Sequence, residues 1–225
     1  MTHRQRLLMV TAALVVIVAA SAVGVAPRLI RSSTADPCVE WQQGSTCQGF
    51  ELVYSGFGKA SAERGGFDLL PAGATAPADT HAALAVRQVP PGSVDVSADI
   101  RTTAQLRHPA PNPWEVGWLV WRYVDDAHFY AVALKPNGWE ISKEDPAYPG
   151  AQRFLATGTR PTFPVGATYR VRVRQDGPLI TVDMPGKSVT VRDHERTYRA
   201  GAVGLYTEDA EVQYSAVTLV PAAAG

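Results

Sequence analysis

The fold of this chain is decided by residues 117–143, GWLVWRYVDDAHFYAVALKPNGWEISK. Apolar and polar residues alternate along three short segments of this stretch, and a period of two is the period of a β-strand. The pair Asp125-Asp126 separates the first two segments, and Asn137-Gly138 separates the last two. Both pairs favour tight turns between antiparallel strands, so the stretch predicts two successive β-hairpins.

The same alternation continues on both sides of this stretch. We expect strands near residues 50–54, 82–88, 94–101, 115–123, 128–135, 139–144, 151–156, 168–175, 178–183, 187–191, 202–207 and 211–219, with a third hairpin turn at Asp176-Gly177. No stretch after residue 35 keeps a helical period over three turns. About twelve strands in one domain cannot remain a single flat sheet, so the sequence predicts an all-β sandwich of two antiparallel sheets.

Two-residue turns would set the register of these hairpins. They would pair Tyr123 with His128, Arg122 with Phe129, Trp121 with Tyr130, Lys135 with Glu140, and Leu134 with Ile141. One face is then apolar and predicts the core: Leu119, Trp121, Tyr130, Val132, Leu134 and Ile141. The opposite face carries Trp118, Arg122, Lys135, Glu140, Ser142 and Glu144 around two alanines, Ala131 and Ala133. In the strand near 168–175, Val171 and Val173 should point inward, and Arg170, Arg172 and Arg174 outward.

Composition excludes several classes of protein. The 225 residues include 21 Lys+Arg and 21 Asp+Glu, so the formal net charge is zero and the basic excess that drives nonspecific nucleic-acid binding is absent. A hydrophobic content of 46% is too high for a disordered chain. We expect a folded monomer with no nucleic-acid partner.

The N-terminus predicts export. His3, Arg4 and Arg6 precede an uncharged apolar run over residues 7–26, so residues 1–30 are interpreted as a cleaved signal peptide or a retained membrane anchor. The protein is therefore expected to be secreted or membrane-anchored, outside the cytoplasm, with no other membrane contact. Residues 31–48 read as a linker in which Cys38 and Cys47 form a small disulfide loop, followed by the domain over residues 49–222.

The polar face of the central hairpins is the candidate site. An ordinary solvated sheet surface is one interpretation, since an alternating strand requires a polar face. However, an indole on a solvated face has no structural reason to be there, whereas the apolar faces of sugars stack on such rings. Trp118 therefore favours a shallow ligand groove with an aromatic floor, in which large and charged side chains surround the two alanines.

Three blocks of the chain resemble the concanavalin A-like lectin/glucanase superfamily. They are the stretch quoted above, FPVGATYRVRVRQDGPLITVDMPGKSVTV (163–191) and GAVGLYTEDAEVQYSAVTL (201–219), and they are similar to laminin-G-like domains and to secreted bacterial domains like family 16 glycoside hydrolases. The resemblance implies a jelly-roll sandwich that binds carbohydrate on a concave face. The expected ligand-binding residues are Trp118 as a stacking platform, with Arg122, Lys135, Glu140, Asp145, Tyr148, Gln152 and Arg172 as polar contacts.

The same resemblance leaves other functions open. Glu140-Ile141-Ser142-Lys143-Glu144 is similar to the Glu-Ile-Asp-x-Glu strand of family 16 glucanases, with Ser142 in place of the Asp, so Glu140 and Glu144 are candidate acids of a glycoside hydrolase. A polysaccharide lyase could use Arg122, Arg172, His128, Tyr130 and Gln152, and a laminin-G-like adhesion module would need no sugar chemistry. No cofactor is expected except a structural calcium ion, for which Glu51, Glu208 and Asp209 are the candidate ligands.

Overall fold

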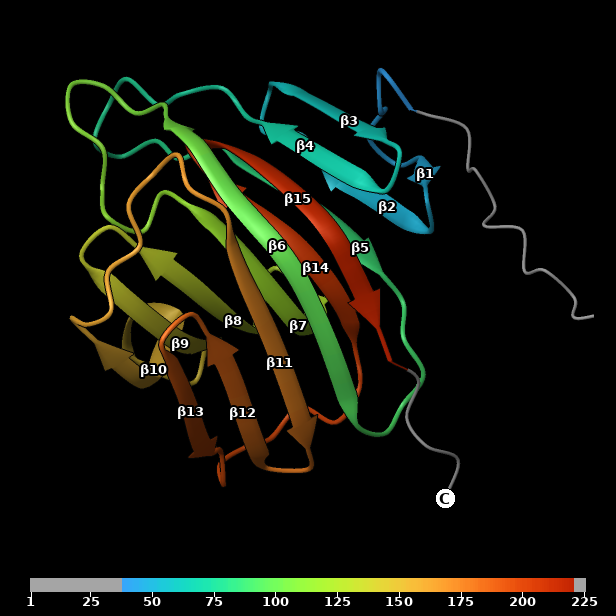
Figure 1. The fold of residues 1–225 in the computed structure, drawn as a ribbon, viewed down its shortest axis with the longest axis vertical. Coiled ribbons are helices and arrows are strands. Elements are labelled where there is room, and N and C mark those ends of the chain that lie inside the picture. Colours follow the sequence, from blue (N-terminus) through green and yellow to red (C-terminus); the bar gives the residue numbers. More distant parts are fainter. Residues whose placement is uncertain (1–37, 221–225) are drawn as a thin grey trace, which may run out of the picture. The chain divides into compact units, whose positions relative to one another are not determined.

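The computed structural model describes residues 38–220, which form two antiparallel β-sheets packed face to face (Figure 1). The expected signal or anchor, residues 1–30, lies outside the described residues. The eight-stranded sheet has the order β1 (Thr46–Cys47), β2 (Phe50–Tyr54), β5 (Ala82–Arg87), β14 (Ala202–Glu208), β7 (Gly117–Asp125), β8 (His128–Lys135), β9 (Gly138–Glu144), β10 (Gln152–Gly158). The seven-stranded sheet has the order β13 (Lys187–Arg192), β12 (Leu179–Met184), β11 (Tyr169–Asp176), β6 (Val94–Gln105), β15 (Ala210–Leu219), β4 (Gly66–Leu70), β3 (Lys59–Glu63).

The predicted fold class is confirmed, and each of the expected strands is present. The prediction missed β1 and the hairpin of β3 and β4. That hairpin turns at Arg64-Gly65, where both residues have positive φ. The single 3-10 turn over Pro149–Ala151 is the only helical element within residues 38–220, and no helix in that range is long and apolar enough to cross a membrane.

The core lies between the two sheets. All six residues that the alternation assigned to it are buried in one cluster: Leu119, Trp121, Tyr130, Val132, Leu134 and Ile141. From the other sheet, Val171 and Val173 are fully buried, while the three arginines of β11 are exposed, as predicted. Period-two patterning therefore assigned these inward-facing residues correctly.

The predicted register is partly wrong. Trp121 does pair with Tyr130, but Asp125 rather than Tyr123 lies opposite His128, because β7 contains a bulge after Trp121. In the next hairpin, the partner of Lys135 is Gly138 rather than Glu140, and Trp139 rather than Ile141 lies opposite Leu134. This second error is a shift of two residues, so each side chain stays on its predicted face.

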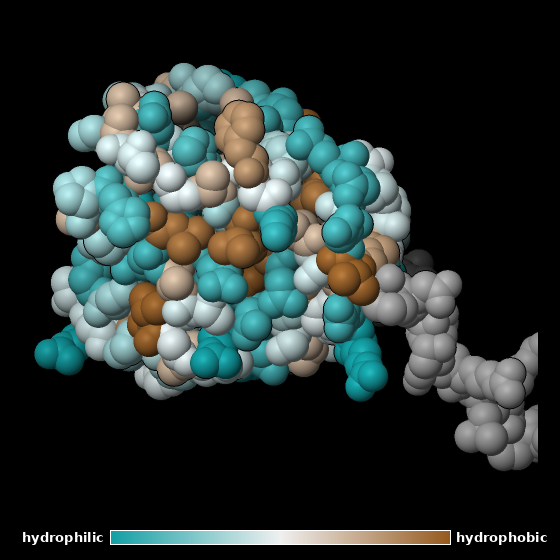
Figure 2. Space-filling model, turned by 90° about the horizontal axis from the view of Figure 1, so that it is seen from above, coloured by the Kyte–Doolittle hydropathy of each residue, from teal (hydrophilic) through white to brown (hydrophobic). Residues whose placement is uncertain are grey.

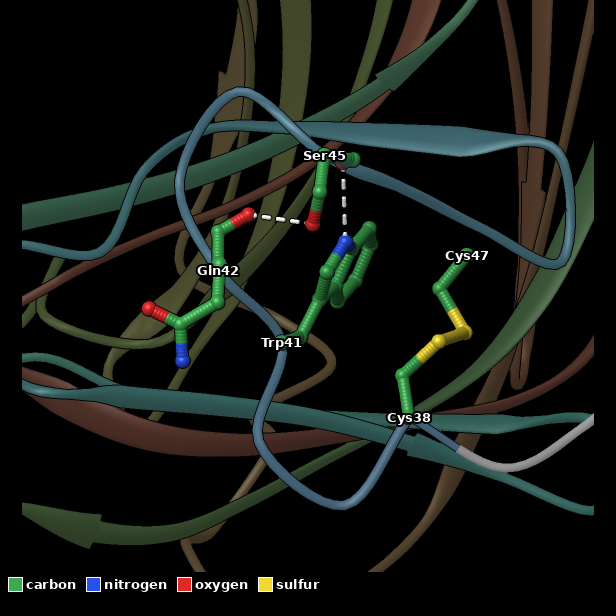
Figure 3. The surroundings of a disulfide bond; sticks show 5 residues. All are labelled: Cys38, Trp41, Gln42, Ser45 and Cys47. Atoms are coloured by element: carbon green, nitrogen blue, oxygen red, sulfur yellow. Dashed lines mark hydrogen bonds between the residues drawn. A yellow bond between two sulfur atoms is a disulfide. The ribbon is translucent and has the colours of Figure 1, made fainter.

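The predicted disulfide between Cys38 and Cys47 is present, with the two Cα atoms 6.3 Å apart. Figure 3 shows Trp41 beside it, where the indole Nε1 donates a hydrogen bond to the carbonyl of Ser45 at 3.0 Å. Both Trp41 and Cys47 are buried in the core between the sheets. The disulfide loop, expected to be a linker, therefore packs as part of the sandwich, and the packed body begins before residue 49.

Candidate functional site

A hollow of about 400 Å³ lies on the outer face of the eight-stranded sheet, over β14, β7, β8, β9 and β10. Its floor follows from the strand register: Tyr206, Trp118, Ala133 and Glu140 are successive partners across β14, β7, β8 and β9. The neighbouring row contains three small residues, Gly204, Ala131 and Ser142. These small side chains leave room on this face of the sheet.

Aromatic rings form the walls and rim of the hollow. Trp118 lies on the predicted face, but only 5% of it is exposed, because its Nε1 donates to the carbonyl of Trp114 at 2.8 Å and its ring packs edge-to-face on Tyr206. The exposed rings are Trp114, 42% exposed, in the loop before β7, and Phe154, 53% exposed, on the edge strand β10. The indole expected to be the platform is therefore a covered part of the floor, and two rings that we did not select reach the solvent.

Four carboxylates also line the hollow: Asp126, Glu140, Glu144 and Glu208. Asp126 accepts hydrogen bonds from the hydroxyl of Tyr123 at 2.7 Å and that of Tyr54 at 3.2 Å, and Glu208 accepts one from Tyr206 at 2.6 Å. The ammonium of Lys135 contacts Glu140 from the margin. Among residues 38–220, no Lys or Arg lines the hollow itself, so the charged side chains that line it are all acidic.

Burial changes the acidity of two of these carboxyls. Desolvation raises the pKa of Glu144 from its usual 4.5 to about 7; a hydrogen bond with Gln152 opposes the rise, and the charges of Glu208 and Glu140 add to it. Desolvation also raises the pKa of Glu208. The hollow can therefore hold or release a proton near neutral pH.

Ser142 lies between Glu140 and Glu144 on the same face of β9. It is 1% exposed, and within the described part of the chain its hydroxyl has no hydrogen-bond partner. A buried hydroxyl without a partner is uncommon and costs free energy. It is therefore an unsatisfied polar group on the hollow's side of the sheet, although it is not among the residues that line the hollow.

The structure brings only part of the expected site together. Trp118, Glu140, Glu144 and Gln152 line the hollow, with Lys135 at its margin. Arg122 does not join them: it occupies the bulge of β7 with a φ of 54° and is 1% exposed. Its guanidinium donates to the carbonyl of Gly92, and burial lowers its pKa. The extra residue of the bulge breaks the alternation on which its predicted face depended.

Asp145 and Tyr148, which were expected to contact the ligand, instead bond to their own loop and to residues 195–196. Asp145 is fully buried; one carboxylate oxygen accepts the backbone N–H of Ala147 at 3.0 Å, and the other lies 3.0 Å from Nε of Arg196. The hydroxyl of Tyr148 donates to Glu195 at 2.9 Å. Neither side chain lines the hollow.

The residues proposed for a lyase are dispersed. Arg172 is on the outer face of the other sheet, where it makes two hydrogen bonds to Asp95 at 2.8 and 2.6 Å. His128 contacts Asp125 at 2.7 Å, and Tyr130 is in the core, where its hydroxyl donates to Asp193 at 2.5 Å. Only Gln152 of this set reaches the hollow.

The expected calcium ligands do not gather into one metal-binding group within residues 38–220. Glu51 is exposed on β2, whereas Asp209 is fully buried. One oxygen of Asp209 accepts the backbone N–H of Ala74 at 2.8 Å, and the other accepts Nη2 of Arg107 at 2.7 Å. Within residues 38–220, no three His, Cys, Asp or Glu side chains gather as a metal-binding group.

Comparison with known proteins places the fold. No protein-family model matches the chain, and no curated protein matches it in sequence. Among solved structures, the carbohydrate-binding module CBM66 from Bacillus subtilis superposes with a TM-score of 0.58 at 16% identity, covering 76% of this chain and 94% of the module. The exoplasmic/lumenal domain of VIP36, bound to Ca²⁺ and Man2, superposes with a TM-score of 0.54 at 12% identity, covering 86% of this chain and 92% of that domain. The chain has the concanavalin A-like jelly-roll fold, as its sequence predicted.

Proposed function

We propose that this protein is an exported carbohydrate-binding domain that holds a sugar of an extracellular or cell-surface polysaccharide in the hollow. The observation that carries the proposal is the pair of exposed rings, Trp114 and Phe154, on the rim of a polar hollow. Such rings cover the apolar C–H faces of a sugar, while carboxylates and the Gln152 amide exchange hydrogen bonds with its hydroxyls. The volume lies within the range of about 300–1,000 Å³ that small-molecule sites occupy.

Three further observations support this function. Carbohydrate-binding proteins of known structure share the fold, which supports carbohydrate binding by this chain without identifying the ligand. The disulfide and the apolar run over residues 7–26 fit a secreted or membrane-anchored protein outside the cytoplasm. In addition, the surface seen in Figure 2 carries its apolar side chains in small patches separated by polar ones, so that face has no broad apolar area for protein adhesion.

Glycoside hydrolysis is a second candidate, which one observation favours. A carboxyl with a pKa of about 7, such as Glu144, can act as a general acid at neutral pH, and Glu140 would be its partner. However, the two residues are four positions apart on β9, which separates their Cα atoms by roughly 13 Å along an extended strand. Paired catalytic carboxyls lie about 5–9.5 Å apart, so both side chains would have to lean together.

Binding and cleavage can be tested on one panel of soluble polysaccharides. Affinity electrophoresis should show retardation by at least one glycan, and Trp114→Ala or Phe154→Ala should each weaken it about three- to tenfold. Phe57→Ala is the matched control, because Phe57 is 90% exposed and lies outside the hollow.

Released reducing ends separate the two candidates. Binding without release supports the binding domain, whereas release that Glu140→Gln abolishes supports the hydrolase. If no glycan binds, or if the Phe57 variant loses as much affinity as the other two, the proposed function is wrong.

A further inference from the structure

We propose further that the hollow selects sugars that carry a free amine over their uncharged and acidic counterparts. This inference rests on the proposed function and specifies the class of its ligand: a protonated hexosamine within a polysaccharide. Three independent features of the hollow carry it.

The first feature is the sign of the charge. Four carboxylates line the hollow, and the ammonium of Lys135 is already engaged by Glu140. Glu144 and Glu208 interact unfavourably with one another in a partly desolvated space. A ligand ammonium would relieve that repulsion, whereas the carboxylate of a uronic acid would increase it.

The second feature is the unpartnered hydroxyl of Ser142, which is buried beneath the hollow, between Glu140 and Glu144 on the same face of β9. A hydroxyl oxygen accepts a hydrogen bond, and an ammonium has three N–H groups to donate. An ammonium that enters between the two carboxylates would therefore also bring a donor toward Ser142. This second observation points to a ligand independently of the acidic residues.

The third feature is the set of aromatic rings beside the carboxylates. Trp118, Tyr206 and Phe129 line the hollow together with the exposed rings of Trp114 and Phe154. Aromatic faces attract cations through their quadrupole, and indole does so most strongly. The rings that would stack on a sugar can therefore also stabilise an ammonium attached to it.

The test compares two ligands that differ only in this charge. Isothermal titration near pH 7 would compare a glucosamine oligomer with its fully N-acetylated counterpart of the same length, and include a polyuronate oligomer. We expect the amine oligomer to bind on the order of tenfold tighter than the acetylated one, with no detectable uronate binding. Added salt should reduce the advantage of the amine.

Two substitutions then locate the effect. Glu144→Gln and Glu208→Gln keep the size of the side chain and should each reduce the preference for the amine about threefold or more. Glu63→Gln, which changes an exposed carboxylate on β3 in the other sheet, should leave it unchanged. Thermal unfolding of each variant checks that the fold is intact, and the ligand comparison on the unaltered protein does not depend on any variant.

The possible failures are distinguishable. If the acetylated or a neutral oligomer binds as tightly as the amine, or the uronate binds best, the selectivity is wrong while carbohydrate binding stands. If the preference for the amine survives in both Gln variants, the ammonium does not lie in the hollow. If no oligomer and no polysaccharide of the panel binds, the proposed function itself fails.

Discussion

At the scale of single residues, Glu144 shows how the hollow departs from an ordinary solvated sheet face. A surface glutamate of a β-strand keeps its usual acidity, but burial raises the pKa of Glu144 to about 7. The groups that face it are Glu140 on its own strand, Gln152 on β10, and Glu208 and Tyr206 on β14, none of which is a cation. The site thus holds a carboxyl in surroundings that disfavour its charge, which is typical of functional sites.

This acidity predicts how stability depends on pH. Because the pKa of Glu144 is higher in the folded chain than the 4.5 of the unfolded one, the folded state binds more protons between pH 4.5 and about 7. The contribution of Glu144 to stability is therefore complete below pH 4.5 and is lost as the pH rises through about 7. We expect Glu144→Gln to remove that loss and to unfold at higher urea than the unaltered protein above neutral pH, by on the order of 1–2 kcal/mol after allowing for solvent screening.

Urea unfolding over a pH series provides the measurement. The raised pKa of Glu208 acts in the same direction, so the Glu144→Gln curve should keep a smaller slope rather than become flat. Glu63→Gln should follow the unaltered protein at every pH. Parallel curves for the Glu144 variant and the unaltered protein would contradict the raised pKa.

At the scale of elements, the bulge of β7 determines which side chains reach the hollow. Arg122 is the extra residue: Trp121 pairs with Val203 and Tyr123 with Ala202, so Arg122 has no partner on β14. Beyond the bulge, Tyr123 joins the apolar residues that border the hollow. The bulge therefore supplies a tyrosine hydroxyl that binds Asp126, and directs Arg122 away.

Gly201 makes room for this bulge and can test its importance. Its φ is +133°, and a Cβ placed there would lie 2.5 Å from the carbonyl carbon of Arg122. Gly201→Ala would thus meet both an unfavourable backbone conformation and a clash with backbone atoms, and should destabilise the fold by about 3 kcal/mol or more in urea unfolding.

A second glycine separates the cost of the backbone conformation from the cost of the clash. Gly186, in the turn before β13, also has a positive φ, +75°, but nothing lies within 4 Å of a Cβ built on it. Gly186→Ala should therefore cost only about 1 kcal/mol, the backbone part alone. Equal losses in the two variants would show that the close approach at the bulge is unimportant.

Local signals in the sequence predicted the core and the hairpins but not the bulge. Alternation identified the core residues Trp121 and Tyr130, and turn pairs located the hairpins, because both signals are local. The bulge at Arg122 was not predictable from these signals, because the sequence of one strand does not show where its pairing with the neighbouring strand shifts. The hairpin of β3 and β4 was missed because its strands are short, and the sequence KASAE of β3 has only small apolar residues.

Residues of the rim were harder still to select. Trp114 stands in a loop and Phe154 on an edge strand, so only their tertiary neighbours decide that they border one hollow. Asp145 and Tyr148 were expected there because they are polar, but their partners, Arg196 and Glu195, come from a distant loop. An aromatic residue in the polar loop Asn112-Pro113-Trp114-Glu115, next to a strand, was the one local signal available for Trp114.

At the scale of the whole molecule, buried polar bonds connect the sheet that carries the hollow to the sheet behind it. The hydroxyl of Tyr214, on β15, donates to the carbonyl of Tyr206 at 2.5 Å and lies 3.2 Å from that of Trp118. Trp121 donates from Nε1 to the side chain of Gln175, on β11, at 2.8 Å. The floor of the hollow is therefore held rigidly from below, which favours a preformed site.

The disulfide stabilises the sandwich at the edge of the sheet farthest from the hollow. β1 and β2 end one side of the eight-stranded sheet, whereas the hollow lies over β14 to β10 on the other. Replacing Cys38 and Cys47 together by Ala should lower the free energy of unfolding by about 2–3 kcal/mol, because the bridge restrains only a short loop of the unfolded chain. Glycan affinity should stay unchanged at temperatures where the variant is folded. Urea unfolding and titration on the same sample test both parts, and a loss of affinity in the folded variant would show that the two edges of the sheet are coupled.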